Sequence, residues 1–257
     1  MRLLRRRLGS NSSGQLLIVA ALTIAVLISS TTMYVYDLTR ETTVAEPQSI
    51  SDLIMSIRQS TRNALISSLA NVSNGGPKTA IVANMNGLSD LLRNLRHLGT
   101  CNQAFAALND SKYDSGSRLT WNEIDSGVSS AYANFTLTVY GTTARATTIY
   151  AVNVTTAVTL KGFYSSLSGI QKRVNATCKV YNENSPALVR NLRIYYSNAG
   201  NWTLVGAENS LTVVNSGNGS YGIGFTVSVS SSTVDVSASV HDLRGIFVKA
   251  NTTCVSP

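Results

Sequence analysis

Residues 215–229 read NSGNGSYGIGFTVSV, and this stretch decides between a nucleotide-binding fold and a β fold. The letters GNGSYG satisfy G-x-G-x-x-G, which is the pattern of a dinucleotide-binding loop. Such a loop must open a helix, because the free N–H groups at the helix N-terminus hold the phosphate. Here apolar residues occupy every second position from Ile223 to Val229, which is the period of a β-strand. The stretch therefore predicts a β-hairpin whose turn lies at residues 215–219.

The same period, interrupted by clusters of turn residues, continues on both sides of this hairpin. After residue 167, five to seven strands are predicted, near residues 172–181, 189–196, 202–205, 211–214, 222–229, 234–240 and 245–250. Short strands at this spacing favour a β-sandwich. Upstream, residues 131–140 and 147–160 alternate in the same way and predict a small antiparallel sheet.

The C-terminal sequence resembles the immunoglobulin-like repeats of surface and filamin-type proteins. The resemblance covers residues 168–250, through the runs RVNATCKVYNENSPALVRNLRIYYSNAGNWTLV, VVNSGNGSYGIGFTVSV and VDVSASVHDLRGIFVKANTT. In those repeats a Gly-Asn-Gly-Ser/Thr-Tyr element marks the turn into a late strand, which residues 217–221 match. The resemblance implies an immunoglobulin-like β-sandwich in which Tyr221 packs at the edge.

Residues 49–100 have a helical period instead. Apolar stripes begin after Ser49 and after Pro77, and NGGP at residues 74–77 separates them, which predicts a helical hairpin. The stripes can pack on each other, on the following sheet or on a neighbouring subunit. Packing within the same chain is the interpretation we favour.

The N-terminus combines arginines with an uncharged segment. Arg2, Arg5, Arg6 and Arg7 supply half of the formal net charge of +8, and residues 16–36 contain no charge. This segment is long enough for a transmembrane helix, with the arginines in the cytoplasm and the rest of the chain outside the cell. The alternative is a cleaved secretory signal.

This N-terminus is similar to archaeal type IV pilin-like precursors, in which the leader is cut just before an apolar helix. The resemblance rests on the basic residues, the pair Gly14 and Gln15, and the apolar segment that follows. It implies processing after Gly14. The chain departs from the pattern at Ser13, where a basic residue is usual, and Pro47 interrupts the expected helical spine.

These observations predict an α+β chain made of successive parts. They are a cytoplasmic basic leader (1–14), an N-terminal transmembrane helix (15–36), a stalk (37–48), a helical hairpin (49–100), a small antiparallel β region (101–166) and a C-terminal Ig-like β-sandwich (167–257).

Two kinds of covalent modification are expected outside the cell. The sequence N-x-S/T, the acceptor of N-glycosylation, occurs at Asn71, Asn109, Asn134, Asn153, Asn175, Asn201, Asn218 and Asn251. Three cysteines allow three disulfide pairings, of which we favour Cys178 with Cys254, because both lie in the predicted sandwich. Cys101 is then free or joined to another chain.

Candidate catalytic groups are few. His97 lies at a predicted helix C-terminus and His241 with Asp242 in a predicted turn, so neither indicates a catalytic site. Four carboxylates before the first predicted strand lack the ligand spacing of a calcium loop, and they are those of Asp110, Asp114, Glu123 and Asp125. We expect no cofactor and no bound metal. We also expect no nucleic-acid partner, because the remaining Lys and Arg residues are scattered along the sequence and do not form a basic cluster.

The sequence favours a non-enzymatic, single-pass membrane protein of the cell surface that acts as an adhesive, pilus-like or cell-envelope component. Its expected partners are membrane lipid, cell-envelope proteins or glycans, and further copies of itself. Two alternatives remain, which are a secreted or anchored carbohydrate-processing hydrolase and a soluble secreted β protein released by signal cleavage.

Overall fold

A computed structural model of the chain describes residues 50–94, 100–140 and 145–257. Strands account for 56% and helices for 21% of the described residues, which makes this part of the chain mostly β. Ile50–Pro257 form one compact unit. The predicted leader, transmembrane helix and stalk, with Gly14 and Gln15, lie outside the described residues.

The GNGSYG motif is a hairpin turn, as its sequence context predicts. Strand β9 (Thr212–Asn215) pairs antiparallel with β10 (Ser220–Ser228). Gly217 and Gly219 have φ angles of 76° and 75°, which glycine adopts without the steric cost that a side chain would bring. The backbone N–H of Gly217 donates to Oδ1 of Asn215 at 2.8 Å. A strand follows the motif, so it does not form a phosphate loop.

Two sheets contain all the strands of the described residues. The larger sheet has the order β1-β3-β4-β5-β10-β9, with β2 beside β3 and β6 beside β5. Its other members are β1 (Thr100–Ala107), β2 (Ser117–Thr120), β3 (Ser126–Tyr140), β4 (Arg145–Ser168), β5 (Gln171–Asn182) and β6 (Ser185–Pro186). The smaller sheet has the order β12-β11-β7-β8, formed by β7 (Val189–Asn198), β8 (Asn201–Leu204), β11 (Val234–Asp242) and β12 (Phe247–Cys254).

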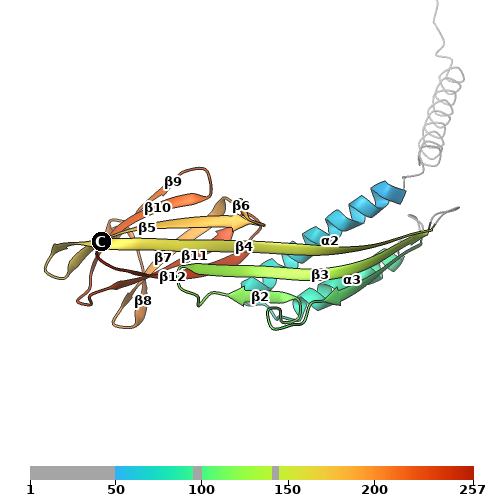
Figure 1. Cartoon of the computed structure of the whole chain (residues 1–257), viewed down its shortest axis with the longest axis horizontal. Helices are drawn as coiled ribbons and strands as arrows, with labels where there is room; N and C mark the ends of the chain where they lie inside the picture. The colour runs from blue at the N-terminus through green and yellow to red at the C-terminus, as the bar shows by residue number, and fades with distance from the viewer. Residues whose placement is uncertain (1–49, 95–99, 141–144) are drawn as a thin grey trace, which may run out of the picture. The chain divides into compact units, whose positions relative to one another are not determined.

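Strand β4 is shared by two hydrophobic cores. It has 24 residues, which at a rise of roughly 3.3 Å per residue extend over about 80 Å. Its first part pairs with β3, and from Thr156 onward it also pairs with β5. Figure 1 shows β4 running the length of the larger sheet. Val152 and Val154 belong to one core, and Val158 and Leu160 to the other.

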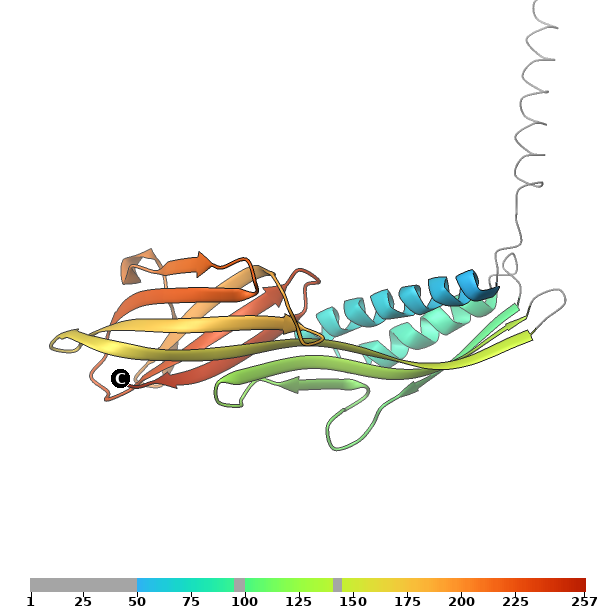
Figure 2. The same ribbon diagram turned by 45° about the horizontal axis from the view of Figure 1, so that its top comes forward.

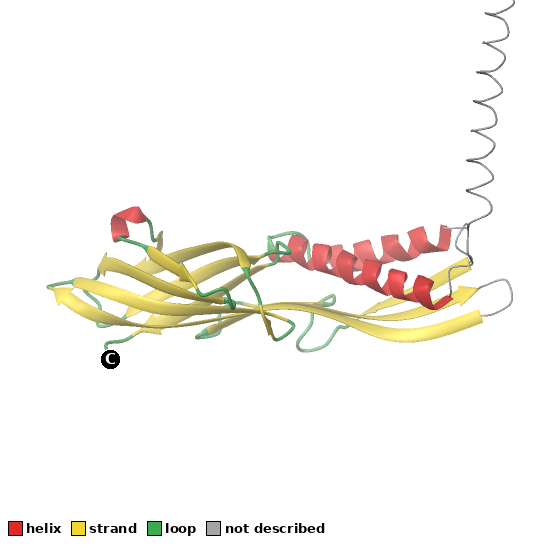
Figure 3. Ribbon diagram, turned by 90° about the horizontal axis from the view of Figure 1, so that it is seen from above, coloured by secondary structure: helices red, strands yellow, loops and turns green. Residues whose placement is uncertain are grey.

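The first core lies between the larger sheet and helices α2 (Ile50–Ser73) and α3 (Ala80–Asn94). Both helices pack against the sheet at one end of the described unit, whereas the short 3-10 helix η1 (Ala207–Asn209) lies at the other (Figures 2 and 3). Large side chains that are fully buried here include Leu65, Leu69, Ile81, Met85, Phe135 and Leu137. The apolar helix stripes thus find their partners within the same chain.

The second core fills the space between the two sheets. Alternate residues of β5, β10 and β11 point into it, and their buried members include Val174, Ile223, Phe225 and Val236. Tyr221 is also buried, and its hydroxyl accepts the backbone N–H of Val189 at 3.0 Å. The resemblance implied that Tyr221 packs at the edge of the sandwich, but in the structure it lies inside the second core.

The sheets meet closely where β3 begins. A Cβ atom added to Gly127 would lie 1.9 Å from the carbonyl oxygen of Lys249 in β12. Only glycine fits at this contact. The same corner includes a backbone hydrogen bond from Asp125 N–H to Asn251 O at 2.7 Å.

The predicted fold class is wrong and is corrected to mostly β. The α+β prediction arranged a helical hairpin, a small sheet and an Ig-like sandwich as successive parts. Instead, one eight-stranded sheet extends through both cores, and α2 and α3 cover one of its faces rather than forming a separate helical part. The predicted division between residues 166 and 167 does not exist, because β4 continues to Ser168 and pairs with β5 from Thr156 onward.

The N-terminal transmembrane helix is not seen in the structure. Within residues 50–94, 100–140 and 145–257, neither long helix has the length and apolar character needed to cross a membrane. The segment for which that helix was predicted, residues 15–36, lies outside these ranges.

Candidate functional site: a polar pocket and a buried ion cluster

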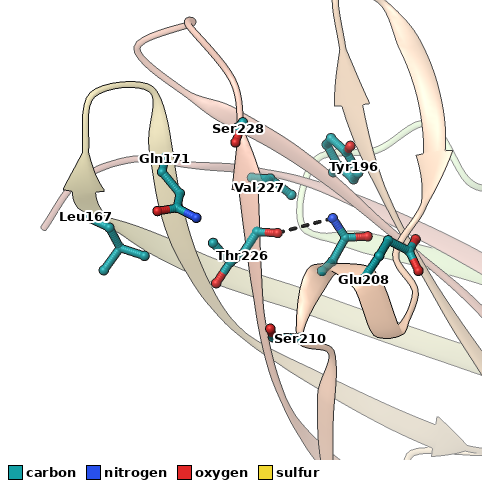
Figure 4. A pocket seen from close by; sticks show the side chains of 9 residues that line it. Leu167, Gln171, Tyr196, Glu208, Ser210, Thr226, Val227 and Ser228 are labelled. Carbon is teal, nitrogen blue, oxygen red and sulfur yellow. Dashed lines mark hydrogen bonds between the residues drawn. The ribbon is translucent and has the colours of Figure 1, made fainter.

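A polar pocket opens where β10 passes the β4–β5 hairpin and helix η1. Its volume is about 350 Å³. Figure 4 shows its walls, with Leu167 at one end and Glu208 at the other. It is lined by Leu167, Gln171, Tyr196, Glu208, Asn209, Ser210, Thr226, Val227 and Ser228.

Helix η1 fixes one wall of this pocket through Asn209. The side-chain amide of Asn209 donates to the carbonyl oxygen of Thr226 at 3.2 Å, which is the dashed line in Figure 4. Its Oδ1 atom accepts the backbone N–H of Gly206 at 3.2 Å. Ser210, which follows the helix, has a left-handed φ of 54°. The sequence therefore uses one amide side chain to attach the β8–β9 connection to β10.

The lining offers neutral hydrogen-bonding groups and one carboxylate. Amide, hydroxyl and phenol groups come from Gln171, Thr226, Ser228 and Tyr196, and the carboxylate is that of Glu208. Hydroxyl-rich ligands such as sugars pair with groups of this kind. A glycosidase would need a second carboxylate across the groove. Among the lining residues Glu208 is the only one.

A buried ion cluster lies between the two cores. Asp242, at the end of β11, is fully buried, and its Oδ2 accepts Nε of Arg244 at 2.8 Å and the hydroxyl of Thr156 at 3.0 Å. Its Oδ1 accepts the backbone N–H groups of Arg244 and Ile246, both at 2.9 Å. Both carboxylate oxygens are satisfied, which a buried charge requires.

Arg244 connects this carboxylate to the strands around it. Its Nη1 atom lies 2.8 Å from Oε1 of Glu183, and its Nη2 atom donates to the carbonyl oxygen of Thr155 at 3.1 Å. Glu183 in turn is 3.5 Å from Arg62 of α2. The cluster thus joins the β11–β12 turn to β4, to the end of β5 and to the helix-covered core.

The histidine and carboxylate candidates from the sequence do not form a catalytic site among the described residues. Nε2 of His241 lies 2.9 Å from Oδ1 of Asn74, whereas Asp242 points to Arg244. His97 lies outside the described residues.

The four carboxylates in the loops before β3 have separate partners. Asp110 caps its own turn, and Asp114 is 2.7 Å from Lys78. Glu123 is 3.9 Å from Arg118, and Asp125 accepts the hydroxyl of Thr252. In the described part of the chain, no three His, Cys, Asp or Glu side chains are close enough together to hold a metal ion.

Three of the predicted glycosylation sites share one surface. Asn134, Asn153 and Asn175 lie on the outer face of the larger sheet, on β3, β4 and β5. Asn71, Asn109, Asn201 and Asn218 are exposed elsewhere. Asn251 differs, because its amide donates to the Trp121 carbonyl oxygen and its Oδ1 is buried. Glycosylation at all eight sites stays a prediction.

The three cysteines are buried, free thiols in the structure. Cys178 and Cys254 both lie in the second core, as the sequence predicts, and Cys101 lies in the first. The sulfur of Cys254 packs against Gly162, where an added Cβ would be 2.8 Å from it. The bridge between Cys178 and Cys254 stays a prediction. Burial raises the pKa of Cys178 to about 12, and burial with nearby Asp235 and Asp125 raises that of Cys254 to about 12.

These raised pKa values predict how stability depends on pH. The folded state holds both thiol protons more tightly than the unfolded state, so this contribution is complete below about pH 9 and is lost as the pH rises toward 12. Each thiol adds a slope of at most roughly 1.4 kcal/mol per pH unit. We expect urea unfolding of Cys178→Ala, measured without reductant between pH 8 and pH 10, to show a shallower pH dependence than the parent. A steeper pH dependence of the variant would instead support the predicted disulfide, because bridged cysteines do not titrate, whereas Cys178→Ala would leave Cys254 as a free, buried thiol.

Comparisons with known proteins add no assignment, because no protein-family model, curated protein or solved structure matches the chain.

Sequence reasoning missed the pocket and most of the ion cluster. The pocket residues come from the β4–β5 hairpin, β7, η1 and β10, so no local motif contains them. Asp242 was predicted to lie with His241 in a turn, and Arg244, two residues further on, is the local signal for an ion pair. Their partner Glu183 is 61 residues away from Arg244 and carries no signal that links it to them.

Proposed function

We propose that the protein is a non-enzymatic, membrane-anchored protein of the cell surface, which acts in adhesion or as a structural component of the cell envelope. Residues 16–36 are the candidate anchor, since they contain no charge and follow four arginines. The described unit would then face the outside of the cell. Cell-envelope proteins or glycans are its proposed partners.

The observation that carries this proposal is the position of the polar pocket relative to the start of the described unit. The unit begins at Ile50 in α2, at the helix-covered end, and the pocket lies beside the β4–β5 hairpin at the other end (Figure 2). Strand β4 joins the two ends over about 80 Å. A sheet of this length is suited to holding a contact site far from the start of the unit.

The location is tested with cells that express the full chain. We expect the protein in the membrane fraction and its C-terminal part accessible to protease added to intact cells. Release into the medium would support the secreted alternative, and an epitope after Pro257 that intact cells protect would contradict the proposed orientation. Sequencing of the mature N-terminus separates an uncut chain from one that starts at Gln15.

The role of the pocket is tested by filling it. Ser228→Trp places an indole in the polar lining, and we expect it to reduce binding of the purified protein to isolated cell-envelope fragments at least about tenfold. Thr147→Trp, an exposed position on β4 outside the pocket and outside every N-x-S/T sequence, is the matched control and should bind as the parent does. If both variants bind the cell-envelope fragments equally well, the pocket does not take part in adhesion. The protein would then have a structural role in the cell envelope.

A further inference from the structure

One side of β4 has no strand partner over its first ten residues. β3 pairs with β4 from Arg145 to Thr159, but β5 joins the opposite side only from Thr156 onward. In the ranges that the structure describes, no other strand pairs with residues 145–154 of β4. Residues 145–154 of β4 therefore have β3 on one side and a free edge on the other, whereas residues 156–159 are paired on both sides (Figure 1).

The contacts of Thr155 show which backbone groups point to this free edge. Its N–H donates to Oε1 of Glu183 at 3.0 Å, and its carbonyl oxygen accepts the N–H of Glu183 at 3.2 Å, so both groups face the β5 side. Backbone groups alternate between the two sides along an antiparallel strand. The N–H and C=O groups of Thr147, Ile149, Ala151 and Asn153 thus face outward, where a further strand would bond.

The surroundings of the edge have room for an added strand. A pocket of about 380 Å³ lies between α2 and β4, lined among others by Met55, Arg58, Arg62 and Tyr150. Met55 is 62% exposed, so its side chain is accessible to an added strand. An added strand would lie roughly 5 Å from β4, and every second side chain would face α2.

The charges beside the edge indicate the chemistry of the partner. The guanidinium of Arg58 lies 4.9 Å from the centre of the Tyr150 ring, and Arg62 is 44% exposed. Arg145 is exposed at the start of β4. The one carboxylate that the structure places next to Arg62 is Glu183, which also pairs with Arg244. The helix-facing side chains of a partner strand would therefore meet positive charge.

We propose that this free edge of β4 binds an extended, acidic segment of a partner protein by strand addition. The segment would supply backbone hydrogen bonds to β4, carboxylates for Arg58 and Arg62, and an apolar side chain over Met55. A second copy of this chain fits less well, because antiparallel pairing of two β4 edges would bring the arginines of both copies together. The proposal does not depend on the proposed location at the cell surface.

Hydrogen exchange at single residues tests the edge itself. In the purified full chain in detergent, we expect the amides of Thr147, Ile149 and Ala151 to exchange at least about 100-fold faster than those of Thr148, Tyr150 and Val152, which bond to β3. Fragmentation of the deuterated protein in the mass spectrometer resolves neighbouring amides. Equal protection of both sets would show that the edge is already covered, and would overturn the proposal.

Peptide binding tests the partner. The probe is the capped peptide ETVTETVTE, in which Glu and Val alternate on one face, and its control is KTVTKTVTK. We expect the acidic peptide to bind at least tenfold more tightly than the control, and to slow exchange at Thr147, Ile149 and Ala151. Arg58→Glu should weaken binding of the acidic peptide at least tenfold.

A backbone variant separates strand addition from simple charge attraction. Ala151→Pro removes one N–H that faces the free edge without removing a bond to β3, so it is compatible with an edge position. We expect it to weaken binding of the acidic peptide at least tenfold while circular dichroism stays unchanged. If Ala151→Pro misfolds, the exchange pattern of the parent with peptide decides. Peptide binding without added protection on β4, or dimerisation of the chain through this edge, would contradict the proposal.

Discussion

Replacing Arg244 with alanine is expected to lower the free energy of unfolding by roughly 3–5 kcal/mol, the range for breaking a buried ion pair. The side chain of Arg244 is 18% exposed, and its partner Asp242 is fully buried. Without the guanidinium, the carboxylate would remain in the interior with its charge uncompensated. Only the backbone N–H groups of residues 244 and 246 and the hydroxyl of Thr156 would still contact it.

Urea unfolding followed by circular dichroism measures this loss. Arg62→Ala is the matched control, since Arg62 belongs to the same cluster but is 44% exposed and 3.5 Å from Glu183. We expect this control to lose less than about 1 kcal/mol, as is usual for exposed ion pairs. If the two variants unfold at the same urea concentration, the cluster contributes no more than a surface contact.

Gly127→Ala is expected to destabilise the fold by about 3 kcal/mol or more, or to prevent folding. The added methyl group would lie 1.9 Å from the carbonyl oxygen of Lys249 and 2.7 Å from its carbonyl carbon. Backbone atoms cannot rotate away as a side chain can. β12 is also held by β11 on one side, where Lys249 is opposite Ser239. The strands β3 and β12 would have to separate.

Gly87→Ala provides the opposite result in the same chain. Gly87 is exposed in α3, and an added Cβ would have no atom within 4 Å. Alanine is the better helix former, so we expect a gain of roughly 0.5–1 kcal/mol. Thermal unfolding of both variants beside the parent is the measurement. A mild effect of Gly127→Ala, similar in size to that of Gly87→Ala, would show that the two strands are not in close contact.

Local features of the fold could be predicted from the sequence because their causes are local. The turn at residues 215–219 depends on Asn and Gly residues that tolerate positive φ, and the strand after it on strict alternation. The seven strands predicted after residue 167 all correspond to strands of the structure. Helices α2 and α3 fall within the two stretches that have a 3.6-residue period.

Features that depend on distant contacts could not be predicted in this way. Strand β1 was missed because a polar residue, Gln103, occupies a buried position that the pattern assigns to apolar residues. The second strand of the predicted small sheet was expected to end at residue 160, but β4 passes through Gly162 and continues to Ser168. The reason for Gly162 is the sulfur of Cys254, 92 residues further along the chain. The polar pocket and the ion cluster are likewise assembled from residues that only the fold brings together.

The sharing of β4 by two cores has a mechanical consequence. The hydrogen bonds that join β4 to β3 and β5 are perpendicular to the strand. A pulling force applied along β4 would load many of these bonds at the same time in shear, rather than opening them one after another like a zipper. A molecule built in this way resists tension along that one direction far better than across it.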